Sequence, residues 1–325
     1  MRSESARASA DLPLAVGPAM SASGGLEGVS MFIATLVAAG RLSRDEILAA
    51  ADLLDAAGVQ SPSWQWLEEG SAADLRFDIA AAQAPIIAAA LEEGLSGVDV
   101  FVLPDASRRK HLLVADMDST MITVECIDEL ADYAGVKAEV AEITERAMRG
   151  ELAFEDALRA RVALLKGLEA EAIDRCRTER VRLTPGARTT VGTMRREGAL
   201  TIMVSGGFTR FADPVGAEIG FERVIANRLV VEEGRLTGAV EPPIVGAEAK
   251  RLALIEGRRD RGLLAEATMA VGDGANDIPM ICEAAFGVSY RAKPAAAEAA
   301  DARIRHNDLT ALLYAQGYRK EEWAV

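Results

Sequence analysis

The sequence has few of the residues that form nitrogen- or sulfur-based metal centres. Only two histidines and three cysteines occur among its 325 residues, and none of the cysteines belongs to a Cys-x-x-Cys pair. This scarcity argues against a disulfide framework, a thiolate zinc site and a histidine-rich metal centre, and leaves little support for a serine–histidine relay. Acid–base chemistry would therefore fall to carboxylates. An odd number of widely spaced cysteines also fits a reducing compartment, so we expect a cytoplasmic protein.

The sequence also lacks a concentrated positive charge and a long hydrophobic run. Its formal net charge is −14, from 36 basic and 50 acidic side chains. The densest basic cluster, Arg108–Lys110, is interpreted as part of a solvated linker, and no nucleic-acid or anionic-membrane partner is expected. The longest nearly apolar stretch, residues 79–91, contains Gln83 and Pro85 and is too short to span a bilayer.

What the sequence does contain is enough apolar material for a sizeable core, since half of its residues are hydrophobic. At roughly 150 residues per domain, the length corresponds to about two domains. Residues 1–25 lack the apolar block of a secretory signal and are predicted to be disordered. Residues 26–106 are predicted to form a small, helical, alanine-rich accessory domain, with helices over 43–57 and 79–92 and a strand over 97–103. Regulation, dimerisation and bracing stay open as its role, and a homodimer is one of the options.

Four short apolar runs that end at polar or glycine residues predict buried strands. They are Leu112–Ala115, Leu200–Val204, Thr268–Val271 and Phe286–Ser289. Helical stretches separate these runs, and strands that alternate with helices imply a doubly wound parallel α/β sheet. Ligands bind such a sheet at the carboxyl ends of its strands, which is where the polar residues fall. We assign residues 107–122 and 184–325 to this core.

Residues 123–183 interrupt the alternation, because they are charged and helix-periodic without a convincing strand. We interpret them as a helical cap inserted over the sheet. A following helix is expected to have Thr184 as its N-cap, Pro185 at its first position and Gly198 beyond its end. A β-hairpin is predicted over residues 226–240.

Two carboxylates, Asp116 and Asp118, follow the first of the predicted core strands. Placed two residues apart in a loop, they could enter one pocket. Such a pair can hold a hard cation through oxygen ligands, or one acid can attack an electrophile while the other manages a proton. A surface aspartate-rich turn is the alternative interpretation of this segment alone.

Three further segments follow strands or precede helices. In Gly272–Asp277, Asp273 could complete a magnesium site with Asp116, although an ordinary Gly-Asp turn has the same appearance. Ser205 with its two following glycines is a natural cradle for phosphate oxygens, or simply a turn. Lys250, placed ahead of a predicted helix, could neutralise a transferring phosphoryl group, but a lone lysine is more often solvent-facing.

Taken together, these motifs resemble the haloacid dehalogenase-like phosphatases. The matching segments are Asp116-Met117-Asp118-Ser119-Thr120, Ser205-Gly206-Gly207-Phe208, Lys250 and Gly272-Asp273-Gly274-Ala275-Asn276-Asp277. More narrowly, the pattern is similar to the phosphoserine phosphatase family. Its further matches are Glu125, Phe154, Arg161 and Ala292-Lys293-Pro294. The resemblance covers about residues 108–315 and implies a Rossmann-like core with a helical cap.

The resemblance implies a two-carboxylate, magnesium-dependent mechanism. Asp116 would attack phosphorus to form an aspartyl-phosphate, and Asp118 would protonate the leaving oxygen and later deprotonate water. Mg²⁺ would be held by the Asp116 carboxylate, the Asp118 main-chain carbonyl and Asp273, with Asp277 orienting its water shell. The residues implied to hold the phosphate are Ser205, Gly206, Lys250 and Asn276.

The implied substrate is the small molecule O-phospho-L-serine, hydrolysed to serine and phosphate in the last step of serine biosynthesis. Glu125 would accept from the ammonium group, Arg161 would bind the carboxylate, and Phe154 would exclude water. One alternative is a related phosphatase or phosphotransferase that acts on phosphohomoserine or a sugar phosphate. Another is a non-catalytic amino-acid-binding protein, although such a protein would be expected to lack Asp116 or Asp118.

Overall fold

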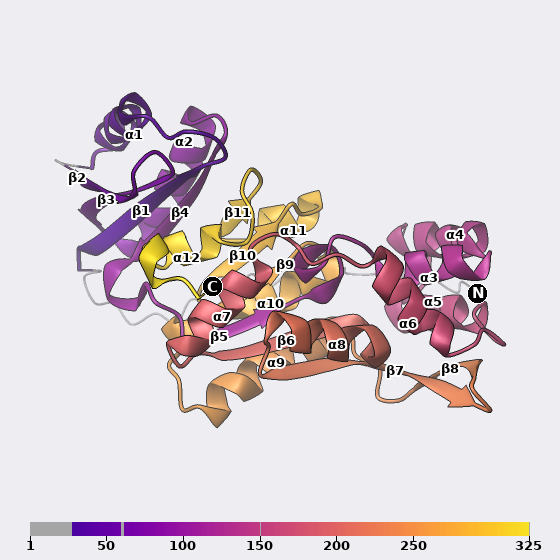
Figure 1. Cartoon of the computed structure of the whole chain (residues 1–325). Helices are drawn as coiled ribbons and strands as arrows, with labels where there is room; N and C mark the ends of the chain where they lie inside the picture. Colours follow the sequence, from indigo (N-terminus) through magenta and orange to yellow (C-terminus); the bar gives the residue numbers. More distant parts are fainter. Residues whose placement is uncertain (1–27, 60–61, 150, 325) are drawn as a thin grey trace, which may run out of the picture.

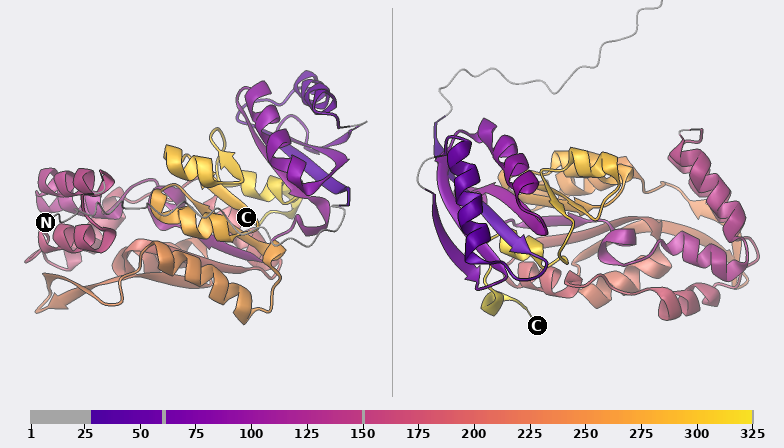
Figure 2. Two further views of the ribbon diagram at one scale, coloured as in Figure 1. Left: turned by 180° about the vertical axis from the view of Figure 1, so that it is seen from behind. Right: turned by 90° about the horizontal axis from the view of Figure 1, so that it is seen from above.

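The computed structural model describes residues 28–59, 62–149 and 151–324, so the predicted disorder of residues 1–25 lies outside it. Two sheets organise the described residues, one of four strands near the N-terminus and one of seven strands in the core. A group of helices lies at the far end of the core from the N-terminal sheet (Figures 1 and 2). No helix within the described ranges is long and apolar enough to cross a membrane.

The N-terminal unit is an antiparallel sheet with two helices, not the helical unit that the sequence predicted. Its elements are β1 (Ser30–Ala38), α1 (Arg44–Ala56), β2 (Ser63–Glu68), β3 (Ala72–Ile79), the short turn η1 (Ala81–Gln83), α2 (Ala84–Gly94) and β4 (Val98–Pro104). The strand order β2-β3-β1-β4 is that of a ferredoxin-like βαββαβ unit. The predicted first helix and last strand are present. The predicted second helix begins later, at Ala84, because residues up to Ile79 belong to β3.

The central strand β1 is buried on both faces of this sheet, which explains why it was missed. In β1, Phe32, Ala34 and Leu36 pack in the cluster with α1 and α2, whereas Val37 joins the main core. A strand buried on both faces shows no alternation of polar and apolar residues. The alanine-rich composition therefore suggested helices where the tertiary structure contains strands.

The core is a doubly wound α/β fold, as predicted. Its sheet has the order β11-β10-β9-β5-β6-β7-β8, and all neighbouring strands pair in parallel except β7 with β8. The strands are β5 (Leu112–Ala115), β6 (Leu200–Phe208), β7 (Arg223–Glu232), β8 (Arg235–Glu241), β9 (Thr268–Gly272), β10 (Gly287–Tyr290) and β11 (Ala302–Ile304).

Helices cover both faces of the core sheet. They are α7 (Ala187–Arg196), α8 (Thr209–Ile219), α9 (Ala247–Asp260), α10 (Ile278–Glu283), α11 (Pro294–Ala299) and α12 (Ala311–Ala315), with short helical turns η2 (Asp105–Ser107), η3 (Met117–Met121), η4 (Ala265–Ala267), η5 (Ala275–Asp277) and η6 (Lys320–Glu322). Leu113 and Ala115 of β5 face the cluster that contains α7 and α8, and Leu112 and Val114 face α9 and α10. This two-sided burial accounts for the uncharged run in the sequence.

Four of the described helices lie within residues 123–183, the segment predicted to be helical. They are α3 (Cys126–Ala134), α4 (Lys137–Met148), α5 (Phe154–Ala163) and α6 (Glu171–Arg180). The chain enters and leaves this cap side by side, because Ile122 and Leu183 form an antiparallel bridge. The β7–β8 hairpin is present and extends beneath the cap, where Leu236 exchanges backbone hydrogen bonds with Gly167 and Leu168.

Two local predictions were wrong. Thr184 does not cap α7; the helix begins at Ala187 after Gly186, whose positive φ of 82° turns the chain. Arg108–Lys110 is not a solvated linker, because Arg108 and Lys110 are buried at 7% and 2% exposure. Buried hydrogen-bond acceptors keep these charges in the interior: Lys110 Nζ donates to the Ser107 and Glu266 carbonyls at 2.7 and 2.8 Å.

Candidate active site

The site begins where β5 ends, at the predicted nucleophile Asp116. The Asp116 backbone N–H donates to the Val271 carbonyl of β9 at 3.0 Å, so this residue is held at the carboxyl edge of the sheet. The loop then turns sharply through Ser119, which has a positive φ of 55°. A positive φ is uncommon for residues other than glycine, and such residues are concentrated at functional sites. Asp116 is 4% exposed and therefore almost fully removed from water.

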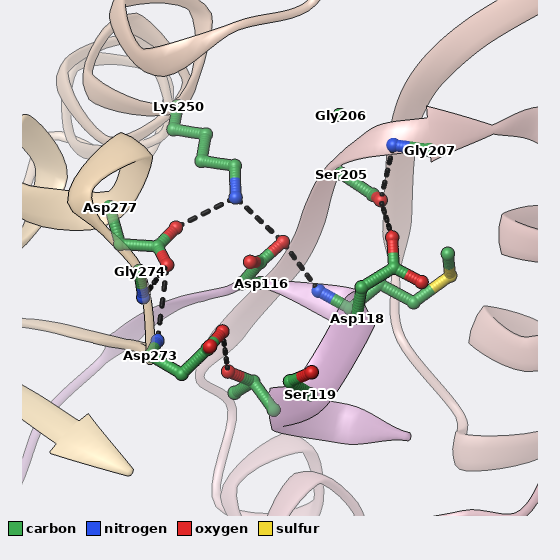
Figure 3. Close-up of polar contacts among 12 residues, drawn as sticks. Asp116, Asp118, Ser119, Ser205, Gly206, Gly207, Lys250, Asp273, Gly274 and Asp277 are labelled. Carbon is green, nitrogen blue, oxygen red and sulfur yellow. Dashed lines mark hydrogen bonds and ion pairs between the residues drawn. The ribbon is translucent and has the colours of Figure 1, made fainter. Parts of the chain in front are cut away.

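Lys250 lies in the first turn of α9 rather than ahead of it, and it is completely buried. Its Nζ atom lies 2.6 Å from Asp116 Oδ1 and 2.7 Å from Asp277 Oδ1 (Figure 3). Burial alone would lower the pKa of Lys250, but the two carboxylates outweigh it and raise the pKa above its usual value. Lys250 is therefore a fixed cation between two acids and not a solvent-facing lysine.

The β9–α10 loop holds Asp277 behind the other acids. Its Oδ2 atom accepts from the backbone N–H groups of Asp273 and Gly274 at 3.1 and 2.9 Å. With Oδ1 on Lys250, both carboxylate oxygens of Asp277 are engaged. A side chain on Gly272 would collide with this carboxyl group, so glycine is required there for the loop to close.

Asp116, Asp273 and Asp277 form a buried acidic cluster in which ligand oxygens lie within 4.8 Å of one another. Burial, followed by the Asp277 charge, raises the pKa of Asp116 well above its usual value and that of Asp273 to about 6. These carboxylates crowd together at a cost that a bound cation would remove. Oxygen-only ligands suit a hard divalent cation, so the residues present fit a metal ion.

Asp118 is directed away from that cluster, toward β6 (Figure 3). Ser205 Oγ donates to Asp118 Oδ2 at 3.3 Å, and the N–H of Cys126 donates to Asp118 Oδ1 at 3.0 Å. Burial, and then the nearby Glu125 charge, raises the pKa of Asp118 to about 6. A carboxyl group with such a pKa can give and take a proton near neutral pH.

A cavity of about 110 Å³ joins these groups to the cap. Of the predicted site residues it is lined by Asp116, Asp118, Glu125, Phe154, Arg161, Gly206, Asp273 and Asn276. Ser205, Lys250 and Asp277 are buried behind that lining and are fully enclosed. The structure therefore brings together residues from β5, β6, α9, the β9–α10 loop and two cap helices.

Glu125 and Arg161 supply opposite charges on the cap side of this cavity. Glu125 precedes α3, and its Oε1 accepts from Ser119 Oγ at 2.7 Å, which ties the cap to the nucleophile loop. Within the part of the chain that the structure describes, Arg161 on α5 donates two long hydrogen bonds, to the Ala157 carbonyl at 3.3 Å and to Thr144 Oγ1 at 3.5 Å. Burial lowers the pKa of Arg161 below its usual value, yet its guanidinium stays charged at neutral pH.

Several residues of the site were not given a role from sequence. Lys293 lines the cavity, and its N–H donates to the Asp273 carbonyl at 3.0 Å. Thr120 Oγ1 donates to Asp273 Oδ1 at 3.3 Å. The family pattern contained Lys293 and Thr120, but nothing in their spacing showed which acid each would contact.

The family assignment follows from comparison with known proteins. A model of the haloacid dehalogenase-like hydrolases matches residues 113–281, and a second model of the same description matches residues 250–315. The first match covers more than half of the chain and includes every acid of the site. The chain belongs to the haloacid dehalogenase-like hydrolases. Its expected family is thereby confirmed.

Curated relatives of this hydrolase include the phosphoserine phosphatase of Streptomyces coelicolor, which is 44% identical over 237 residues. That match covers 72% of this chain and 58% of the relative. The chain spans 58%, 53% and 63% of the length of three curated relatives that it matches.

Two solved structures extend the comparison. A probable phosphoserine phosphatase from Vibrio cholerae is 30% identical with a TM-score of 0.69, over 90% of this chain and 88% of that one. A phospho-aspartyl intermediate analogue of phosphoserine phosphatase is 40% identical with a TM-score of 0.59, over 63% of this chain and 98% of that one. The first likeness includes the N-terminal unit, whereas the second covers about the length of core and cap.

Proposed function

We propose that this hydrolase is a phosphoserine phosphatase, which converts O-phospho-L-serine to L-serine and phosphate. The observation that carries the proposal is a single small cavity lined by the Asp116–Asp118 pair at one side and by Glu125 and Arg161 at the other. A sugar phosphate has neither an ammonium nor a carboxylate group for the latter two residues to bind. The similarity to curated phosphoserine phosphatases supports the same substrate class.

In the proposed mechanism, Asp116 attacks phosphorus and the serine oxygen leaves. The P–O bond to serine breaks as the bond to the Asp116 carboxylate oxygen forms, and Asp118 gives its proton to the departing oxygen. Asp118 then accepts a proton from the water that attacks the aspartyl-phosphate, which restores both acids. Lys250 holds Asp116 in place and offsets negative charge, and its two short contacts support that role.

We further propose that the buried acidic cluster takes Mg²⁺. The ion would be held by Asp116, Asp273 and the Asp118 main-chain carbonyl. Asp277, whose two carboxylate oxygens already accept hydrogen bonds, would orient the water shell of the ion. When bound, the ion supplies positive charge that reduces repulsion between an anionic carboxylate and an anionic phosphate ester. The Ser205 hydroxyl and the Gly206 backbone N–H would bind phosphate oxygens, with Asn276 nearby, while the Gly207 N–H holds Ser205 Oγ in place at 2.8 Å.

Glu125 and Arg161 would bind the two ends of the amino acid. The Glu125 carboxylate accepts from the ammonium group, and the planar Arg161 guanidinium pairs with the carboxylate. Phe154, with its ring at the cavity edge, would limit access of water. The two hydrogen bonds of the half-buried Arg161 are long, at 3.3 and 3.5 Å, which leaves its guanidinium available to pair with a carboxylate and supports this assignment.

The decisive test is phosphate release from O-phospho-L-serine with and without Mg²⁺. We expect activity that requires Mg²⁺ and falls at least about 10³-fold in Asp116→Asn, which removes the attacking oxygen anion. Asp52→Asn, on the exposed surface of α1, is the matched control and should retain full activity. Unchanged turnover in Asp116→Asn would overturn the covalent mechanism.

The substrate is tested by assaying O-phosphoserine, phosphohomoserine and glucose 6-phosphate side by side. We expect kcat/KM to be highest for O-phosphoserine and lowest for the sugar phosphate, which lacks both amino-acid charges. A higher kcat/KM for phosphohomoserine would leave the proposed mechanism standing but would replace the proposed substrate.

Free Cys126, Cys176 and Cys282 support a reducing, cytoplasmic location for this activity.

A further inference from the structure

The phosphate-binding segment of β6 is an irregularity in strand pairing. Ser205 pairs with Ala226 of β7, but the next paired residue, Phe208, lies opposite Asn227. Gly206 and Gly207 are therefore extra residues in β6 that have no partner on β7. A bulge of this kind redirects backbone groups and leaves some of them without their usual ladder partners. The bulge takes Gly206 and Gly207 out of the β7 ladder, so the Gly207 N–H donates to Ser205 Oγ at 2.8 Å and the Gly206 carbonyl needs a donor other than the β7 backbone.

Asn227 supplies that donor. Its Nδ2 donates to the Gly206 carbonyl at 2.9 Å and to the Val245 carbonyl at 3.1 Å. Its Oδ1 accepts from the Val245 N–H at 2.7 Å. The side chain uses both of its donors, and it is 1% exposed. It does not line the cavity, so it acts on the site only through the segments it holds.

The two segments that Asn227 joins carry separate parts of the site. Gly206 belongs to the bulge, and Val245 directly precedes Gly246, the residue before α9, whose first turn contains Lys250. The Phe154 ring of the cap rests on both: a Cβ placed on Gly206 would lie 3.2 Å from its Cζ, and one on Gly246 3.2 Å from its Cδ1. We call Gly206 and Gly246 the glycine shelf.

We propose that Asn227 is a positioning residue that holds the bulge and the start of α9 in register. This sets both the Gly206 backbone of the phosphate cradle and the glycine shelf on which Phe154 rests. The inference rests on the proposed function, since it assigns phosphate binding to the bulge. Loss of Asn227 would let the bulge relax, because the part-buried Gly206 carbonyl would lose its donor. The loss of Asn227 would weaken the binding of the substrate's phosphate group, whatever the rest of the substrate is.

Two variants and one control test this role. Asn227→Asp keeps the shape of the side chain and its Oδ1 acceptor. It replaces the Nδ2 donor with an oxygen, which cannot donate to the Gly206 and Val245 carbonyls. Asn227→Ala removes all three hydrogen bonds. Thr201→Val is the control, because Thr201 is equally buried on β6 and also loses one hydrogen bond, from the Glu222 N–H, but at the opposite end of the strand. For each chain, inorganic phosphate binding is measured calorimetrically with Mg²⁺ present, together with kinetics and the Tm.

We expect both Asn227 variants to bind inorganic phosphate at least about tenfold more weakly, which is roughly the loss of one good hydrogen bond. The kcat/KM should fall by similar factors for O-phosphoserine and p-nitrophenyl phosphate, because the defect lies at the phosphate. Thr201→Val should lower the Tm while leaving phosphate binding within about twofold of the wild type.

Phosphate binding within twofold of the wild type in Asn227→Asp, or equal weakening in Thr201→Val, would overturn the proposal. The phosphate measurement is independent of turnover. A wild-type chain that binds phosphate but does not hydrolyse O-phosphoserine would therefore refute the proposed function alone, and the comparison of variants would still decide the role of Asn227.

Discussion

At the scale of single residues, the site is an excess of buried carboxylates around one buried cation. Lys250 compensates Asp116 and Asp277 directly, while burial raises the pKa of Asp273 to about 6. Because carboxylates outnumber cations here, the positive charge for the proposed anionic substrate would come from the proposed Mg²⁺ together with Arg161, in a chain whose formal net charge is −14. Arg161 is the further cation that lines the cavity from the cap.

Replacing Arg161 by alanine should separate amino-acid binding from phosphate chemistry. We expect the KM for O-phosphoserine to rise at least about tenfold, because a charge-assisted hydrogen bond to the substrate carboxylate is lost. The KM for p-nitrophenyl phosphate, which has no carboxylate, should stay nearly unchanged. Arg159→Ala on the same helix is the control, since Arg159 is about half exposed and lies 3.9 Å from Glu155. Equal losses on both substrates would contradict the assignment.

At the scale of elements, strand ends and helix starts place the chemistry. β5 delivers Asp116, the bulge in β6 presents its glycines, and the first turn of α9 positions Lys250. The two strands are anchored by apolar residues on both faces of the sheet, and α9 packs on one face through Ala253 and Leu254, so the polar ends have little freedom to move. Precise placement of such groups contributes directly to rate.

Gly207→Ala tests the close approach in the bulge. A Cβ at this position would lie 2.9 Å from Asp118 Oδ2 and 3.0 Å from Ser205 Oγ. We expect kcat for O-phosphoserine to fall at least about tenfold, because the acid and the phosphate cradle would be pushed apart. Gly40→Ala, where a Cβ would meet nothing within 4 Å, should have no effect on steady-state turnover. Full activity in Gly207→Ala would show that the bulge tolerates a side chain.

The capping box of α1 gives a stability prediction that is separate from catalysis. Ser43 Oγ accepts from the Glu46 N–H at 3.2 Å, and Glu46 Oε2 accepts from the Ser43 N–H at 2.7 Å. Ser43→Ala should lower the free energy of unfolding by about 1 kcal/mol, measured by denaturant titration. Phosphate release should not change, because α1 packs in the N-terminal unit. An unaltered free energy of unfolding would mean that water replaces the Ser43 hydroxyl as the acceptor for the Glu46 N–H.

At the scale of the whole molecule, the N-terminal unit is joined to the core through buried charge. Arg108, directly after η2, lies 2.6 Å from Asp74 Oδ1 of β3, and its Nε donates to the Ala315 carbonyl at 2.9 Å. Asp99 of β4 accepts from the backbone N–H groups of Arg305, His306 and Asn307. These contacts favour a bracing role for the N-terminal unit.

Replacing only one partner of the Arg108–Asp74 ion pair should lower the free energy of unfolding. In Arg108→Ala, the fully buried Asp74 carboxylate loses its partner, and we expect the free energy of unfolding to fall by about 3–5 kcal/mol. The double variant Arg108→Met with Asp74→Leu removes both charges and should recover part of this loss. Calorimetry on the full chain measures both. A double variant less stable than Arg108→Ala would show that the pair stabilises the junction beyond charge compensation.

The sequence by itself determined the elements whose signals are local. The uncharged run Leu112–Ala115 predicted β5, the apolar run and turn residues after it predicted an acid pair at a sheet edge, and Ser43 with Glu46 predicted the start of α1. The family pattern then identified the acids, because a motif depends on residue types at fixed short spacings. These features need only neighbours within a few residues.

Only the tertiary structure decided the features that depend on distant partners. Arg108 and the Ala315 carbonyl are 207 residues apart, so nothing near Arg108 in the sequence showed that it would be buried. The strand β1 is buried on both sides and therefore lacks the alternation that would reveal it. Asn227 likewise gains its role only when the fold brings Gly206 and Val245 to its carboxamide. Which side chains are buried and which groups pair depends on how the whole chain packs, whereas the spacing of residues in a motif is given by the sequence itself.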